Sequence, residues 1–263
     1  MRILAIGPGE STQWLFSRED VKIPEDVITI GMHRVFPYIK NIKLDYWTWG
    51  DPDAAIEGLR IFNTSKNLEN LPTVIIPSYM ETVADFSANC GTSPLTFQRR
   101  VNDINLYNST ISKLKGSKVK LVPNSYNTKT LGKSHKIFSK VEERFSRKNN
   151  YFGSVPFDGA RSESNWAQEN KFTNTILPIC YYLGATEVYC IGFDNRGKGI
   201  KRSIPQSKNN PKIINNHLSK LRKWTVDWKD HHNMQIFSIT PDRFTPNNTI
   251  LDYISIEDLA WIN

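Results

Sequence analysis

The segment Arg2-Ile3-Leu4-Ala5-Ile6-Gly7-Pro8-Gly9-Glu10-Ser11-Thr12 decides the fold. Its first half is a short aliphatic run of the kind found in buried strands. Two glycines flanking a proline follow directly, and the amphipathic stretch Trp14-Leu15-Phe16 comes next. A strand, a glycine-containing turn and a helix in this order predict the opening unit of an α/β fold.

Short β-branched or aromatic runs recur along the chain. They cover residues 27–30, 44–49, 73–76, 118–122, 187–192 and 235–239, and helices are predicted at 174–183, 213–232 and 256–262. Gly184 should end the first of these helices as a left-handed cap. Strands that alternate with helices predict a Rossmann-like, mostly parallel sheet with helices on both faces. At 263 residues, one nucleotide-sugar-binding domain over 1–263 is the expected organisation.

Two long polar segments interrupt this alternation. Residues 123–163 are rich in Asn, Ser, Lys and Gly and contain one helical candidate, at 134–147. Residues 195–216 form a second, lysine-bearing segment. Segments of this length with little regular secondary structure are usually functional lids or mobile insertions, so we expect both to be lids or insertions.

The composition points to a basic protein without membrane or zinc signatures. The formal net charge is +8, with lysine and arginine concentrated in 113–148 and 198–212. Such runs attract phosphates or a polyanion, although a solvated basic face explains them equally well. The amino terminus lacks the long apolar stretch of a signal or membrane span, which favours a cytoplasmic location. The three cysteines, Cys90, Cys180 and Cys190, are widely spaced, which favours core thiols over a metal site.

The turn after the first strand is a candidate phosphate site. Glycines at Gly7 and Gly9, beside Pro8, let main-chain amides approach an anion, and Ser11 can cap the following helix. The third glycine of a dinucleotide fingerprint and the Gly-Lys-Ser/Thr of a Walker loop are both missing. A plain tight turn is the alternative interpretation.

Other polar residues follow the predicted strands. Because ligands of open parallel sheets gather at the carboxyl ends of the strands, these residues should meet at one edge. His33 is either an acid/base group or a structural side chain, and Asp51 and Asp53 either hold a metal or cap a helix. Arg34 and Asp194 are the other candidate binding residues expected at this edge of the sheet.

The late part of the chain adds two further candidates. Thr173-Asn174-Thr175 precedes the helical stretch at 176–183 and could present a second helix start to a phosphate, or simply cap that helix. His217 lies beside a predicted lid, where a histidine can serve as general base.

Four stretches resemble one family. Residues 6–11, 30–36, 45–52 and 174–194 are similar, in order, to motifs of the family 42 bacterial sialyltransferases and of a related superfamily that includes motility-associated proteins and an archaeal pterin pyrophosphokinase. The resemblance implies a Rossmann-like transferase that binds a nucleotide-activated donor, typically a CMP-sugar, without a metal for chemistry. It also implies a base in the late region, for which His217 is the nearest candidate. Pro8 and His33 stand where the family has asparagines.

The leading hypothesis is therefore a glycosyltransferase-like enzyme that moves a sugar from a CMP- or UDP-sugar to a hydroxyl acceptor. Its candidate catalytic residues are His217, His33 and Asp51. No cofactor is required, and a divalent metal is left open. The acceptor could itself be DNA or another polyanion. Two alternatives are a nucleotide or nucleic-acid binding module without catalysis and a magnesium-dependent pyrophosphokinase or nucleotide hydrolase.

Overall fold

A computed structural model describes ten stretches of the chain, which fall in two compact units. The first unit comprises residues 1–47 and 172–263, and the second comprises residues 48–171. Both predicted lids and the predicted helices at 134–147 and 213–232 lie outside the described residues. The described stretches are 1–18, 21–39, 41–49, 52–77, 80–82, 97–122, 176–193, 234–239, 252–255 and 258–259.

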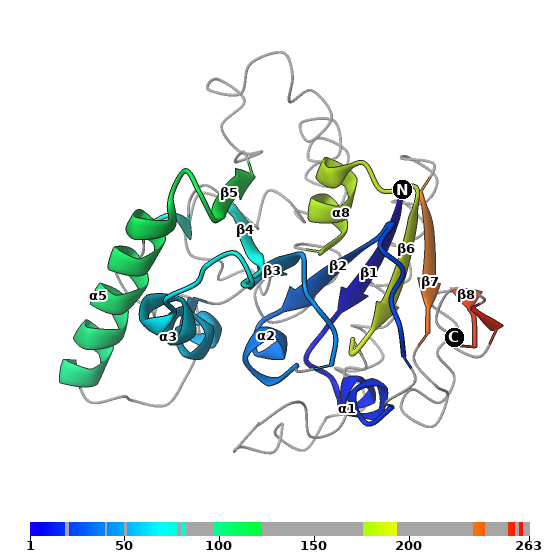
Figure 1. The fold of residues 1–263 in the computed structure, drawn as a ribbon, viewed down its shortest axis with the longest axis horizontal. Coiled ribbons are helices and arrows are strands. Elements are labelled where there is room, and N and C mark those ends of the chain that lie inside the picture. Colours follow the sequence, from blue (N-terminus) through cyan, green and yellow to red (C-terminus); the bar gives the residue numbers. More distant parts are fainter. Residues whose placement is uncertain are drawn as a thin grey trace, which may run out of the picture. The chain divides into compact units, whose positions relative to one another are not determined.

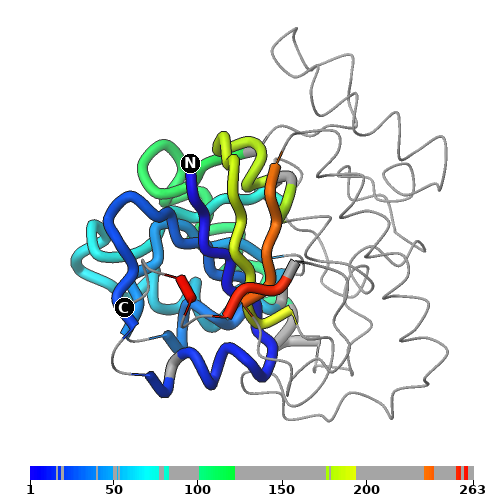
Figure 2. Tube along the Cα trace, turned by 90° about the vertical axis from the view of Figure 1, so that its right-hand side faces the viewer, coloured from blue at the N-terminus to red at the C-terminus, as the bar shows by residue number. Residues whose placement is uncertain are grey.

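The first unit is built on parallel strands, with β1 in a central position (Figure 1). The strand order is β3-β2-β1-β6-β7-β8; β1 pairs in parallel with β2 and β6, β6 with β7, and β7 with β8. Figure 2 shows β1, β6 and β7 side by side. This arrangement confirms the predicted Rossmann-like α/β fold. The elements are β1 Arg2–Ile6, α1 Glu10–Phe16, β2 Val27–Met32, α2 Val35–Tyr38, β3 Tyr46–Thr48, α8 Leu177–Leu183, β6 Glu187–Ile191, β7 Gln235–Ser238 and β8 Asp252–Tyr253; the last residue of β3 belongs to the second unit.

The central strand is covered on both faces. Ile3, Leu4, Ala5 and Ile6 are all completely buried. Because successive side chains of a strand point to opposite faces, burial of all four requires a packed layer on each side of the sheet. One of these layers contains Leu4, Ile6, Leu15, Val21, Val27, Val35, Ile42, Leu44, Tyr189, Ile191, Ile239 and Leu259.

Helix α8 ends at the predicted glycine. Gly184 adopts φ 88° and ψ 31°, and its N–H donates to the carbonyl of Tyr181. A left-handed residue is the common way to close a helix, and glycine adopts it without strain from a β-carbon. The next residues enter β6, which lies beside β1 with Arg2 opposite Glu187.

The second unit contains a parallel strand pair and two longer helices. Val74 of β4 lies opposite Val119 of β5, and α3 contacts α5. The sequence reasoning did not single out α5, although Tyr107, Ile111 and Leu114 follow helical spacing and are buried. The elements are η1 Pro52–Ala55, α3 Ile56–Thr64, β4 Thr73–Pro77, α5 Phe97–Leu114 and β5 Val119–Val122.

The hydroxyl of Tyr107 joins two buried polar groups of the second unit by hydrogen bonds. Its hydroxyl accepts a hydrogen bond from Trp49 Nε1 at 3.1 Å and donates to the carbonyl of Met80 at 2.7 Å. The rings of Trp49 and Tyr107 meet edge to face, with centroids 5.9 Å apart. One hydroxyl therefore satisfies a donor and an acceptor that are both shielded from water.

Replacing Tyr107 by Phe should lower the free energy of unfolding by about 1–3 kcal/mol, because the buried Trp49 donor and the Met80 carbonyl lose their partner. Chemical denaturation followed by tryptophan fluorescence measures this. The matched control is Tyr253→Phe, because Tyr253 is 46% exposed, and its effect should stay within about 0.5 kcal/mol. Equal effects of the two substitutions would contradict the role given to Tyr107.

Candidate functional site at the carboxyl ends of β1 and β6

The strand order places a crossover point between β1 and β6. The chain continues from β1 to β2 on one side, whereas β6 continues to β7 on the other. Parallel sheets of this kind bind ligands outside the carboxyl ends of the strands at the point where the order reverses. The register pairs Ile6 with Ile191, so Gly7 and Gly192 leave the sheet together.

Gly7 and Gly192 are in direct main-chain contact. The Gly7 N–H donates to the Ile191 carbonyl, and the Gly9 N–H donates to the Gly192 carbonyl, both at 2.7 Å. A β-carbon on Gly7 would lie 2.4 Å from the Gly192 oxygen, and one on Gly192 would lie 2.2 Å from the Gly7 oxygen. The two positions therefore require glycine because their backbones approach too closely for any side chain.

The hydroxyl of Ser11 joins the two strand ends, and that of Thr12 holds the turn after β1. Thr12 Oγ1 donates to the carbonyl of Gly7 at 2.6 Å, and the Gly192 N–H donates to Ser11 Oγ at 2.9 Å. Both side chains are completely buried. From the sequence Ser11 was expected to cap the following helix, because its contact with Gly192, 181 residues away, leaves no signal in the local sequence. We call Gly7, Gly9, Ser11, Thr12 and Gly192 the glycine corner.

Replacing Gly192 by Ala should lower the free energy of unfolding by about 3 kcal/mol or more, because the β-carbon would lie 2.0 Å from Thr12 Oγ1 and φ is +81°. Gly184→Ala is the matched control. Its φ is +88° and the space around it is open, so only the backbone cost of about 1 kcal/mol applies. Urea denaturation of both variants gives the difference. A Gly192→Ala effect no larger than that of Gly184→Ala would refute the close contact.

His33 lies at the carboxyl end of the neighbouring strand β2. It adopts φ 55°, a left-handed conformation that is uncommon outside glycine and for which histidine is among the more tolerant residues. Its carbonyl accepts a hydrogen bond from Trp47 Nε1 at 2.6 Å, and its side chain is buried. Arg34 follows it and is half-buried. Because Gly31 pairs with Ile6, both residues belong to the same end of the sheet as the glycine corner.

The remaining candidates lie outside the described residues, so their contribution stays a prediction. Among the described residues, no group of three His, Cys, Asp or Glu side chains has the proximity that a metal site needs. The same stretches contain no helix long and apolar enough to cross a membrane. The side chain of Asp53 is likewise not described. The candidates outside are Asp51, Thr173, Asn174, Thr175, Asp194 and His217.

Two of the three cysteines are core thiols, as predicted. Cys180 and Cys190 are free and buried, and desolvation raises the pKa of each thiol well above its usual value. Cys190 Sγ also donates to the carbonyl of Phe237 at 2.8 Å. Neither is therefore a nucleophile at neutral pH. Cys90 lies outside the described residues.

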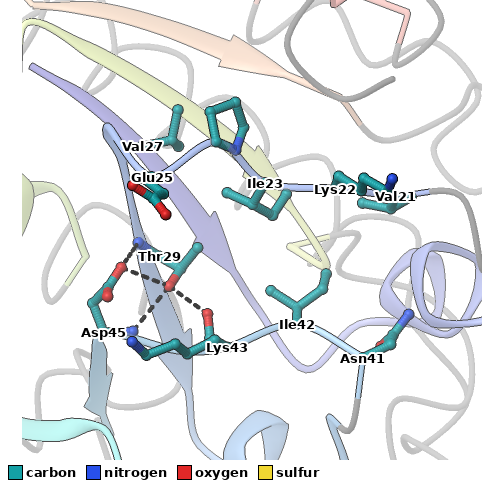
Figure 3. Close-up of a pocket in the computed structure, with 11 residues that line it drawn as sticks. Val21, Lys22, Ile23, Glu25, Val27, Thr29, Asn41, Ile42, Lys43 and Asp45 are labelled. Atoms are coloured by element: carbon teal, nitrogen blue, oxygen red, sulfur yellow. Dashed lines mark hydrogen bonds between the residues drawn. The ribbon is translucent and has the colours of Figure 1, made fainter.

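A pocket of about 560 Å³ opens elsewhere in the first unit, between segments 21–25 and 41–45 (Figure 3). It borders the first half of β2, whereas ligands of parallel sheets bind at the other end of the strands. The Thr29 N–H donates to Asp45 Oδ2 at 2.8 Å, and the Asp45 N–H donates to Thr29 Oγ1 at 2.9 Å. These bonds join the start of β3 to β2, which is a structural role.

Two described lysines of the basic run, Lys115 and Lys118, bond within local structure. Lys115 pairs with Glu81, and Lys118 Nζ donates to the carbonyl of Leu71 at 2.8 Å and to that of Glu69 at 3.3 Å. Lysines engaged in this way have less freedom to contact a polyanion. Because most of the basic residues lie outside the described stretches, a polyanionic acceptor stays a prediction.

The parallel strand order and the glycine corner define a class, the Rossmann-like α/β proteins with a ligand edge between two central strands. Two solved structures are similar to this chain over 96% of its length and 88% of theirs, at 11% identity. They are the sialyltransferase CST-II in complex with a trisaccharide acceptor and CMP, with a TM-score of 0.46, and monomeric CstII, with a TM-score of 0.44. No family model and no curated protein matches the chain. Similarity at this level does not transfer a donor or an acceptor to this protein.

Proposed function

We propose that this protein is a glycosyltransferase-like enzyme that transfers a sugar from a CMP- or UDP-sugar to a hydroxyl acceptor. The observation that carries the proposal is the glycine corner at the crossover between β1 and β6. There the half-buried turn at Pro8 and Gly9 lies at the place where parallel sheets bind nucleotides. The motif resemblance of the sequence supports a nucleotide-activated sugar as the donor.

The nucleotide would lie across the ends of β1 and β6. Gly7, Pro8 and Gly9 would approach it through the main chain, and Ser11 would support this turn from beneath. The phosphates would lie toward the helix start formed by Thr173, Asn174 and Thr175, because amides at a helix start favour anions. Arg34 and Asp194 would flank the nucleotide.

The transfer needs a base and a stabilised leaving group. The acceptor oxygen attacks the anomeric carbon, its proton passes to the base, and the bond from that carbon to the phosphate oxygen breaks, releasing the nucleotide. His217 is the first candidate base and His33 the second, with Asp51 as a further catalytic candidate. Helix-start amides and basic side chains would stabilise the charge on the departing phosphate, so the reaction needs no metal.

Nucleotides and nucleotide sugars should raise the melting temperature by several degrees, because a ligand that binds only the folded state stabilises it, by about 2.7 kcal/mol at a hundredfold excess over Kd. The measurement is a thermal-shift series with CMP, UMP, a CMP-sugar and a UDP-sugar. Gly9→Val should remove the shift. Gly9 has φ −72° and ψ 174°, which any residue adopts, so the fold should persist.

Gly116→Asn is the control for this series, since Gly116 lies in the other unit with open space around it and asparagine tolerates its φ of +83°, and it should leave the shift in place. A second measurement follows the release of free nucleotide from a CMP- or UDP-sugar, with and without a chelator. It distinguishes the proposed transferase from the alternative functions. Loss of turnover in the chelator would favour a metal-dependent kinase or hydrolase. Binding without turnover would favour a binding module, and absence of any shift would overturn the proposal.

A further inference from the structure

We propose that the ribose and base of the nucleotide, rather than its phosphates, lie against the glycine corner. This rests on the proposed function and specifies which part of the donor the corner recognises. Three properties of the corner support it. Its amides already donate hydrogen bonds within the protein, a carboxylate follows directly after Gly9, and its glycines carry no side chains.

Several main-chain amides of the corner already donate within the protein. The Gly7 and Gly9 amides donate to the Ile191 and Gly192 carbonyls, and the Thr12 amide lies 3.3 Å from the Gly9 carbonyl that it donates to. A phosphate bound by these amides would have to break bonds that join β1 to β6. Each broken bond would leave a shielded carbonyl without a partner, which is costly.

The two hydroxyls of the corner are committed as well. Thr12 Oγ1 donates to the Gly7 carbonyl, and Ser11 Oγ accepts from the Gly192 N–H. Both side chains are fully buried, so they support the turn from inside and do not present a donor to solvent. A phosphate needs several donors directed at it, and the corner directs these donors inward.

The charge of the corner also disfavours a phosphate. Glu10 follows Gly9 directly and is exposed, so the turn carries a carboxylate. A carboxylate repels a phosphate at short range but accepts hydrogen bonds from hydroxyls such as those of ribose. The turn therefore matches the hydroxyl-bearing, uncharged part of a nucleotide.

The shape of the corner fits a ring in van der Waals contact. Gly7 and Gly192 are buried against each other, whereas Pro8 and Gly9 are half-buried and form the accessible part of the turn. Because Gly9 has no side chain, a flat group can approach the main chain closely there. Contact of this kind needs no free amide, which agrees with the internal bonding of the corner.

Calorimetric titration of the full-length protein with CMP and cytidine, and with UMP and uridine, tests the orientation. Glu10→Gln should weaken binding of a nucleotide and of its nucleoside by the same factor, about threefold, because an amide oxygen accepts a ribose hydroxyl more weakly than a carboxylate does. The ratio of the two Kd values should stay within about twofold of its wild-type value, since the same contact is weakened for both ligands. Glu25→Gln is the control, because Glu25 is also exposed and precedes the opposite end of β2, and it should change neither Kd.

If the phosphates lie against the corner, Glu10→Gln should change the affinity for the nucleotide in the opposite direction. If phosphate lies beside Glu10, Glu10→Gln should tighten nucleotide binding about fivefold and leave the nucleoside unchanged. That result, or no effect of Glu10→Gln on either ligand, overturns this inference while the proposed function stands. Failure of the wild-type protein to bind any of the four ligands would instead overturn the proposed function and this inference together.

Discussion

The first unit depends on the contact between the main chains of Gly7 and Gly192. Two strand ends that lie more than 180 residues apart in sequence are joined there by three hydrogen bonds, two between main-chain groups and one through Ser11, while Thr12 bonds to Gly7 within the turn. The contact fixes the register of β1 against β6, and with it the place where the strand order reverses. The absence of side chains at these two buried positions is thus a structural requirement, and the half-buried Pro8 and Gly9 are the accessible part of the turn.

Much of the first unit could be predicted from sequence because its strands are short, buried and aliphatic. The runs that became β1, β2 and β6 were found within two residues of their observed ends, and the left-handed Gly184 was expected from its position after an apolar helix. Strand β8 was missed because it has two residues, Asp252 and Tyr253, and no period can show in so short a run. Helix α5 was expected only as a helix-like stretch without bounds after the strand at 73–76, because its buried face is narrow and interrupted by polar residues such as Asp103.

The candidate site was predictable in position but not in detail. That the turn of residues 7–9 meets the end of β6 follows from the general geometry of parallel sheets. That the Gly7 and Gly9 amides donate to β6 cannot be inferred locally, because their partners, Ile191 and Gly192, lie far away in sequence. A glycine-rich turn suggests an anion site when it is considered alone. With its partners in place, the same turn offers a carboxylate and a close-packed surface, which favours the neutral part of a nucleotide.

The most direct test of the central claim is hydrogen exchange with mass spectrometry, with and without saturating CMP or UMP. We expect slower exchange in two separate segments, residues 7–14 and 187–193, because a ligand at the crossover shields and stabilises both. Peptides from β4 and β5 should exchange at unchanged rates. Binding that leaves both of the first segments unaffected, or that protects only the second unit, would contradict the placement of the ligand site at the ends of β1 and β6.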